Sequence, residues 1–236
     1  MLPRKLLSRA LLVPVVAVSG LVLGAQPAQA ALTGSISAED FVLQNKCRNQ
    51  TVDYAFAVSP DTLLWQVKLT MVSPNGRTSE GVDLSSVDGD ATSGTVRFLI
   101  CGSATPGTYA ISTVGSYQVV PLLNLPVTVA ESTFEVRRAA TRTGLSRSHL
   151  TGHHYRLVAK VMDQRRQGFK PTTSAEVVFQ RLVDGAWTTF RGSRTLTDHG
   201  RATAVVTATS GTRVRAVTRP DGYLGGSSSR SVRLHP

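Results

Sequence analysis

The sequence has little of what catalytic and metal-binding proteins use at their sites. It contains two cysteines and five histidines, and aromatic residues make up 6% of its 236 positions. It has no G-x-S-x-G nucleophile elbow, no S-x-x-K pair and no H-E-x-x-H motif. His153 and His154 are neighbours, so on a strand they would point to opposite faces and could not chelate one ion together. The sequence therefore predicts a protein that is not an enzyme and that holds no metal and no cofactor.

Long hydrophobic runs are also scarce, and the one present lies at the start of the chain. It extends from Ala10 to Gly24 and is too short to span a bilayer, which needs about 20 residues. Basic residues precede it, and Ala28-Gln29-Ala30 matches the A-x-A pattern that signal peptidase cleaves. We predict that residues 1–30 are a signal peptide. No later stretch is long enough for a transmembrane segment, so we expect a protein that is secreted or loosely associated with the cell surface.

Acidic residues are scarce in the second half of the chain. Residues 31–132 carry five basic and nine acidic side chains. Residues 133–236 carry 18 basic and six acidic side chains, a net charge of +12. A shift of this size at one point favours a domain boundary, and each half has the length of a small domain. We therefore predict an acidic domain at residues 31–132 and a basic domain at residues 133–236.

Almost no segment has the 3.6-residue period of an amphipathic helix. Short runs rich in Val, Thr, Ile, Tyr and Phe alternate instead with turn-forming clusters, which is typical of a β-sandwich or barrel. In the first half we expect strands near Phe41–Gln44, Thr51–Val58, Trp65–Val72, Thr95–Cys101, Thr108–Val114 and Pro126–Ala130. In the second half we expect them near His154–Met162, Ala175–Val183, Ala186–Arg191, Arg201–Ala208, Thr212–Thr218 and Ser231–Leu234.

Turn signals and alternation refine these strands. Ser73-Pro74-Asn75-Gly76 predicts a tight turn, and Asp184-Gly185 predicts a hairpin turn of type I′. The polar segment Ser79–Gly94 predicts a loop that holds no more than a short edge strand. Within His154–Met162, alternation places the apolar residues inward and Arg156 and Lys160 outward.

The two cysteines are Cys47 and Cys101. An even number in an exported chain favours a disulfide. A zinc site is disfavoured, because two thiols without a nearby Cys or His pair supply only half of a tetrahedral shell. We interpret the pair as a structural bridge, which would stabilise the fold by about 4 kcal/mol in the chain-entropy account. The alternative is a catalytic or sensing thiol.

Four features of the first half, Cys47, Trp65, Cys101 and the PGTY run Pro106–Tyr109, resemble bacterial immunoglobulin-like domains. The match departs from antibody domains because Cys101 precedes the PGTY turn. The strand order that the resemblance implies places Cys47 just before the second strand and Cys101 at the end of the fifth. The disulfide would then lie within one sheet and join two neighbouring antiparallel strands at its edge. Trp65 would fill the core, the alternative being a surface role in binding.

The second half resembles immunoglobulin-like modules of exported actinobacterial proteins. The matching segments are Val178–Arg181, Asp184–Trp187, Asp198–Arg201, Arg213–Arg215 and Tyr223 with Ser227–Ser231. Together the resemblances cover nearly the whole mature chain. They imply an all-β protein of two tandem immunoglobulin-like antiparallel β-sandwiches after a cleaved signal peptide. The motifs lie in turns and cores, so they carry information about fold and little about function.

The basic half supplies the functional hypothesis. On the strand Thr212–Thr218, Arg213 and Arg215 share a face, and Arg219 continues that alternation. The candidate polyanion-binding residues are Arg181, Arg191, Arg213, Arg215, Arg219 and Arg233. Arginine suits this role because its planar guanidinium binds phosphate or carboxylate through two hydrogen bonds. The alternative is a solvated face on an arginine-rich protein.

The expected partner is an extracellular polyanion or envelope component, such as teichoic acid, an anionic glycan or lipid headgroups. Specific nucleic-acid recognition is not expected, since no helix or aromatic stacking platform is evident. We predict a non-catalytic secreted protein that acts in binding or adhesion at the cell envelope. The alternative function is a secreted protein-binding inhibitor, for example of a protease, that acts through the loop Ser79–Gly94. The acidic residues of that loop lack the Gly and Glu of an EF-hand. We interpret the loop as solvated, and the alternative is a calcium site of a looser loop type.

Overall fold

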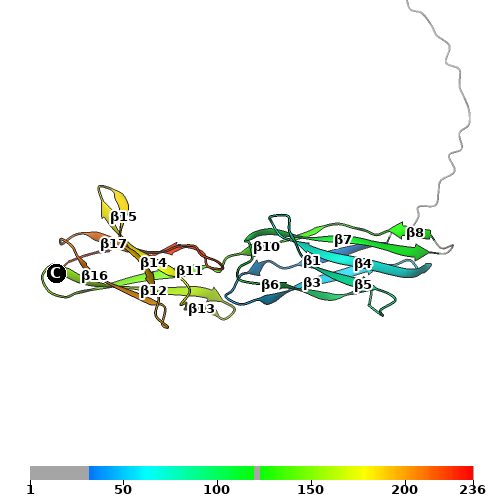
Figure 1. Ribbon diagram of the computed structural model, residues 1–236, viewed down its shortest axis with the longest axis horizontal. Helices are drawn as coiled ribbons and strands as arrows, with labels where there is room; N and C mark the ends of the chain where they lie inside the picture. Colours follow the sequence, from blue (N-terminus) through cyan, green and yellow to red (C-terminus); the bar gives the residue numbers. More distant parts are fainter. Residues whose placement is uncertain (1–31, 120–122, 236) are drawn as a thin grey trace, which may run out of the picture. The chain divides into compact units, whose positions relative to one another are not determined.

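The computed structural model describes residues 32–119 and 123–235, and every regular element in these ranges is a β-strand. The strands form four sheets, two built from residues 33–137 and two from residues 141–233 (Figure 1). The expected all-β sandwich fold is therefore confirmed. The predicted signal peptide, residues 1–30, lies outside the described residues. The described part of the chain contains no helix with the length and apolar character of a membrane span.

Residues 33–137, called the first half from here on, contribute strands β1 to β10. Their bounds are β1 (Thr33–Ala38), β2 (Phe41–Val42), β3 (Arg48–Ala57), β4 (Thr62–Val72), β5 (Thr78–Ser85), β6 (Ser93–Ile100), β7 (Gly107–Val119), β8 (Leu123–Pro126), β9 (Thr128–Val129) and β10 (Ser132–Arg137). Sheet I has the order β6-β3-β1-β9. Sheet II has the order β2-β10-β7-β4-β5, with β8 paired to β7.

Alternation along β3 and β4 builds the core between sheets I and II. Val52, Tyr54 and Phe56 are buried on β3, and the residues between them are exposed. From sheet II, Trp65 is buried and meets Phe56 edge to face, with ring centroids 6.0 Å apart. Because β-strand side chains point alternately to the two faces, one side of each sheet is apolar. The prediction that Trp65 lies in the core is confirmed.

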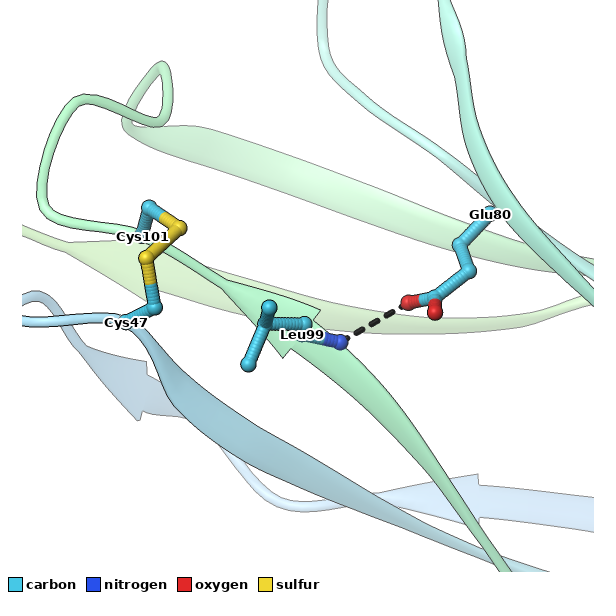
Figure 2. Close-up of a disulfide and its surroundings, with 4 residues drawn as sticks. All are labelled: Cys47, Glu80, Leu99 and Cys101. Atoms are coloured by element: carbon cyan, nitrogen blue, oxygen red, sulfur yellow. Dashed lines mark hydrogen bonds between the residues drawn. A yellow bond between two sulfur atoms is a disulfide. The ribbon is translucent and has the colours of Figure 1, made fainter.

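Cys47 and Cys101 form a disulfide at the edge of sheet I (Figure 2). Arg48 on β3 lies opposite Ile100 on β6, so the two cysteines follow as the next pair in the same antiparallel register. β6 is the edge strand of its sheet. The bridge therefore joins neighbouring strands of one sheet and leaves the space between the sheets to apolar side chains, as the resemblance implied.

The segment Ser79–Gly94 contains an edge strand, as its prediction allowed, but the strand is longer and the loop shorter than expected. β5 pairs with β4 over its length and forms the edge of sheet II, and only residues 86–92 lie outside strands. An edge strand makes backbone hydrogen bonds on one side only and keeps many polar side chains, so β5 shows only a short apolar alternation, at Val82 and Leu84. Asp83 of β5 forms an exposed ion pair with Lys68 of β4 at 3.9 Å.

The carboxylate of Glu80 on β5 reaches the edge of β6. The backbone N–H of Leu99 donates to Glu80 Oε2 at 2.8 Å, as Figure 2 shows. We expect Glu80→Ala to release this edge amide and to speed its hydrogen exchange about threefold to tenfold, since such a bond contributes about 0.5–1.5 kcal/mol. Amide exchange measured by NMR tests this. Exchange of Leu99 at the wild-type rate would contradict the expectation, and Asp83→Ala on the same strand is the matched control.

The second half contributes strands β11 to β19. Their bounds are β11 (Thr141–His149), β12 (His154–Arg165), β13 (Gly168–Pro171), β14 (Glu176–Val183), β15 (Ala186–Thr195), β16 (Arg201–Thr207), β17 (Arg213–Thr218), β18 (Ser227–Ser228) and β19 (Val232–Arg233). Sheet III has the order β11-β12-β13, with β16 also paired to β12. Sheet IV has the order β15-β14-β17-β18, with β19 also paired to β17.

The core of this half lies between sheets III and IV. From sheet III, Leu157 and Val161 are fully buried on β12, and from sheet IV, Phe179 and Ala216 are fully buried on β14 and β17. The inward alternation expected for β12 is therefore confirmed. The tight hairpin between β14 and β15 is also confirmed, because Asp184 and Gly185 adopt the positive φ angles of 49° and 82° that a type I′ turn needs.

Candidate functional site

β17 directs two arginines outward from sheet IV. Val214 and Ala216 are buried on the inner side of β17. Arg213 and Arg215 alternate with them along the strand, so they point away from the core. Arg213 lies directly opposite Arg233 on β19, in an antiparallel pair whose side chains share one face. Two like charges in opposite positions of a sheet repel each other and lower stability. The pair of Arg213 and Arg233 therefore concentrates two positive charges where β17 meets β19.

Neighbouring side chains hold Arg215 in place. Its Nε donates to Oε1 of Gln180, the residue opposite it on β14, at 2.8 Å. Its guanidinium carbon lies 4.3 Å from the ring centroid of Trp187 on β15. A cation above an indole ring is attracted by the negative face of the ring. The guanidinium is thus ordered before any ligand arrives, which lowers the entropy that binding would cost.

Within the described residues, this group of arginines enters no ion pair with a carboxylate. Among residues 32–119 and 123–235, the ion pairs join Lys68 with Asp83, Arg137 with Asp40 and Arg165 with Asp163. Arg213, Arg215 and Arg233 belong to none of them. We call these three residues, together with Trp187 and Gln180, the sheet IV basic face. Its side chains can donate hydrogen bonds to an anion, and nothing in the arrangement supplies a nucleophile or a general base.

The other predicted arginines lie elsewhere on sheet IV or beside it. Arg219 follows β17, and its backbone N–H donates to the carbonyl of Glu176 at 3.3 Å. Arg191 is exposed on β15, next to a register shift opposite β14. Arg181 pairs with Val214 and so has the inward direction of alternation. It lines a cavity of about 650 Å³ together with His153, away from the sheet IV basic face.

Basic residues on sheet III were not among the candidates. Arg142, Lys160 and Arg201 occupy outward positions of β11, β12 and β16 and are exposed. For Lys160, the alternation of residues along β12 is enough to predict an outward position from the sequence alone. The position of Lys160 relative to Arg142 and Arg201 depends on the register of the strands across the sheet, and no local signal in the sequence specifies that register.

The acidic segment of the first half uses several of its carboxylates within the fold. Besides Glu80 and Asp83, Asp90 Oδ2 accepts a hydrogen bond from the backbone N–H of Ser85 at 2.8 Å. Within the described ranges, His, Cys, Asp and Glu form no group of three or more that could hold a metal ion. Burial raises the pKa of Tyr54, and the charge of Asp90 raises it further. Burial also raises the pKa of Tyr109.

No protein family model matches the chain, and no curated protein is similar to it in sequence.

Proposed function

We propose that the protein is a non-catalytic binding protein that acts outside the cytoplasm and holds a polyanion on the sheet IV basic face. The observation that carries the proposal is the cluster of Arg213, Arg215 and Arg233, in which Gln180 and Trp187 hold Arg215 and which enters none of the ion pairs of the described residues. The predicted signal peptide supports an extracytoplasmic location. The disulfide supports it as well, because such bonds persist mainly in oxidising compartments.

We further propose that the chain is built of two tandem immunoglobulin-like sandwiches. In the first half, β1, β3 and β6 share one sheet, and β5, β4, β7 and β10 share the other. In the second half, β11, β12 and β16 share one sheet, and β15, β14, β17 and β19 share the other. Both arrangements follow the immunoglobulin pattern, in which strands A, B and E face strands C′, C, F and G. The pairing of β10 with β7 favours a domain boundary between β10 and β11.

The ligand class follows from the chemistry of the face. Its guanidinium groups each offer several N–H donors and a permanent charge, which match phosphate and sulfate groups. Along a strand, residues on one face repeat about every 7 Å, and neighbouring strands lie about 4.8 Å apart. A polymer with repeated anionic groups can contact several of these cations together. It releases condensed counterions as it binds, and its affinity therefore depends on salt.

The triple variant R213Q/R215Q/R233Q tests the proposal. With inorganic tripolyphosphate as the probe, we expect the affinity at this face to fall about 100-fold at 0.1 M salt. The plot of log affinity against log salt should become shallower by about 2, since three phosphate contacts are lost. The measurement is an NMR titration of the Trp187 indole N–H, which reports on the face itself.

The matched control is K46Q/R77Q/R97Q, which removes the same charge from exposed positions of the first half. It should leave the Trp187 titration within about twofold of wild type. Equal losses in the two triple variants would show that net charge alone governs binding, and would overturn the proposed face.

A further inference from the structure

A second basic face lies on the outward side of sheet III. Lys160 on β12 stands directly opposite Arg201 on β16, which is a like-charge pair of the same kind as Arg213 and Arg233. On the other side of β12, Arg142 on β11 is opposite Met162, two residues along from Lys160. The three cations therefore lie on three neighbouring strands, two of them directly opposite each other and the third two residues farther along β12.

Acidic residues are absent from the outward positions of this sheet. Those positions are Arg142, Gly144, Ser146, Ser148, His154, Arg156, Val158, Lys160, Met162, Gln164, Phe169, Pro171, Arg201, Thr203, Val205 and Thr207. The ion pairs of the described chain include none of its cations. Asp163 is buried on the opposite, inward side, where it pairs with Arg165 at 2.9 Å. The charge of this face is thus uncompensated.

An aromatic ring orders one cation on this face, as on sheet IV. The guanidinium carbon of Arg142 lies 3.8 Å from the ring centroid of Phe169 on β13. On sheet IV, Arg215 lies 4.3 Å from the centroid of Trp187. Each face therefore combines a pair of opposed cations with an arginine stacked on a ring. Stacking holds the guanidinium in place and leaves its N–H donors available to an anion.

The two basic faces point in opposite directions. Sheets III and IV bury the core of the second half between them (Figure 1). Packed sheets lie about 10 Å apart, so cations that project from the two outer sides are separated on the order of 20 Å. A short anion that occupies one face cannot reach the other.

We propose that sheet III carries a second polyanion-binding face, so that one molecule joins two anionic chains. The inference rests on the proposed function, because it assigns a second site to the same class of ligand. Two sites on one body make the protein a cross-linker of anionic polymers, and binding of many molecules along each polymer raises the avidity of the network. The face comprises Arg142, Lys160 and Arg201, with Arg156 about 13 Å farther along β12.

Two measurements with defined phosphate probes test the inference. In the first, inorganic tripolyphosphate is titrated while NMR follows two local reporters, the Gly144 amide on sheet III and the Trp187 indole on sheet IV. We expect both to respond in the wild type. The variant R142Q/K160Q/R201Q should weaken the Gly144 response about 100-fold at 0.1 M salt. The same variant should leave the Trp187 response within about twofold of wild type, and R213Q/R215Q/R233Q should do the reverse.

The second measurement detects cross-linking. Two pools of long-chain polyphosphate, end-labelled with a donor or an acceptor fluorophore, are mixed with limiting protein. We expect energy transfer between chains with the wild type and with the control K46Q/R77Q/R97Q. Each face variant should reduce the transfer at least tenfold, since a molecule with one face holds one chain. Sedimentation of each protein alone checks that all share one oligomeric state.

The outcomes separate the two proposals. If neither reporter responds, the proposed function and the second face both fail. If Trp187 responds and Gly144 does not, sheet IV binds alone and the second face is overturned. The second face is also overturned if R142Q/K160Q/R201Q cross-links polyphosphate as well as the control does. Responses at both reporters, with transfer lost in both face variants, establish a bivalent protein.

Discussion

A protein in which Cys47 and Cys101 are both replaced by Ala is expected to lose about 4 kcal/mol of unfolding free energy in its first half. The disulfide closes a loop between residues 54 positions apart. Removing a cross-link of this length restores conformational entropy to the unfolded chain, and the chain-entropy account gives about 4 kcal/mol for it. Cys47 is exposed beside the edge strand β6, so the substitution removes little packing. Almost the whole loss should therefore come from the unfolded state.

Urea titration followed by NMR measures this loss. The two tryptophans give separate indole signals, Trp65 from the first half and Trp187 from the second. With a urea dependence of about 2 kcal/mol per molar, the Trp65 midpoint should fall by about 2 M. The wild type under reducing conditions is the control and should behave like the variant. A shift of the Trp65 midpoint below about 0.5 M would show that the bridge does not restrict the unfolded chain.

The alternation of core residues could be predicted because it is local. The inward face of β12 is evident from Leu157, Ala159 and Val161, within five positions of the sequence, whatever lies across the sandwich. The hairpin at Asp184-Gly185 is equally local, since two residues that accept positive φ specify the turn. These features needed no knowledge of the partner strands.

Unlike the edge strands β6 and β15, the more polar edge strands β5 and β11 could not be predicted in full from alternation. β5 and β11 carry Ser, Thr, Gly and charged residues, and neither shows a run of buried apolar positions. Each forms because a neighbouring strand, β4 or β12, presents an unsatisfied row of backbone donors and acceptors along its length. That requirement belongs to the neighbour and leaves no pattern in the edge strand itself. Glu80 is a further case, because its contact with Leu99 joins edges of different sheets.

In the candidate site too, features set by local alternation could be predicted, and features set by the pairing of distant strands could not. Alternation on β17 placed Arg213 and Arg215 on one face without any knowledge of the fold. It could not show that Arg233 lies opposite Arg213, or that Arg181 has the inward direction, because register between strands is not encoded locally. The cations of sheet III were missed for this reason: Lys160 and Arg201 are 41 positions apart, and Arg142 lies on a strand that the sequence did not reveal.

The basic faces depend on the core beneath them. Gln180 and Trp187 hold Arg215 only while β14 stays paired with both β15 and β17. Phe179, next to Gln180, points to the other side of β14 and is fully buried opposite Ala216. A substitution at Phe179 that disturbs the pairing of β14 with β15 and β17 would therefore also disturb the contacts of Arg215 on the outer face.

Phe179→Ala is expected to destabilise the second half by about 3–5 kcal/mol, because truncating a buried ring loses its transfer free energy and leaves a cavity. The Trp187 midpoint in urea should fall by about 2 M, again at about 2 kcal/mol per molar. Where the second half has unfolded, tripolyphosphate should no longer bind at the sheet IV basic face. The Trp65 midpoint should stay within about 0.3 M of wild type, because the proposed tandem arrangement gives each half a core of its own.

Phe179→Leu is the matched control. It keeps most of the buried volume and should cost less than about 1.5 kcal/mol, with tripolyphosphate binding retained. The comparison also tests the tandem arrangement. If Phe179→Ala moves the Trp65 and Trp187 midpoints together, the two halves unfold as one unit, and the proposal of two independent immunoglobulin-like sandwiches is wrong. If only Trp187 moves, the basic half is a separate module that carries its anion-binding faces on its own core.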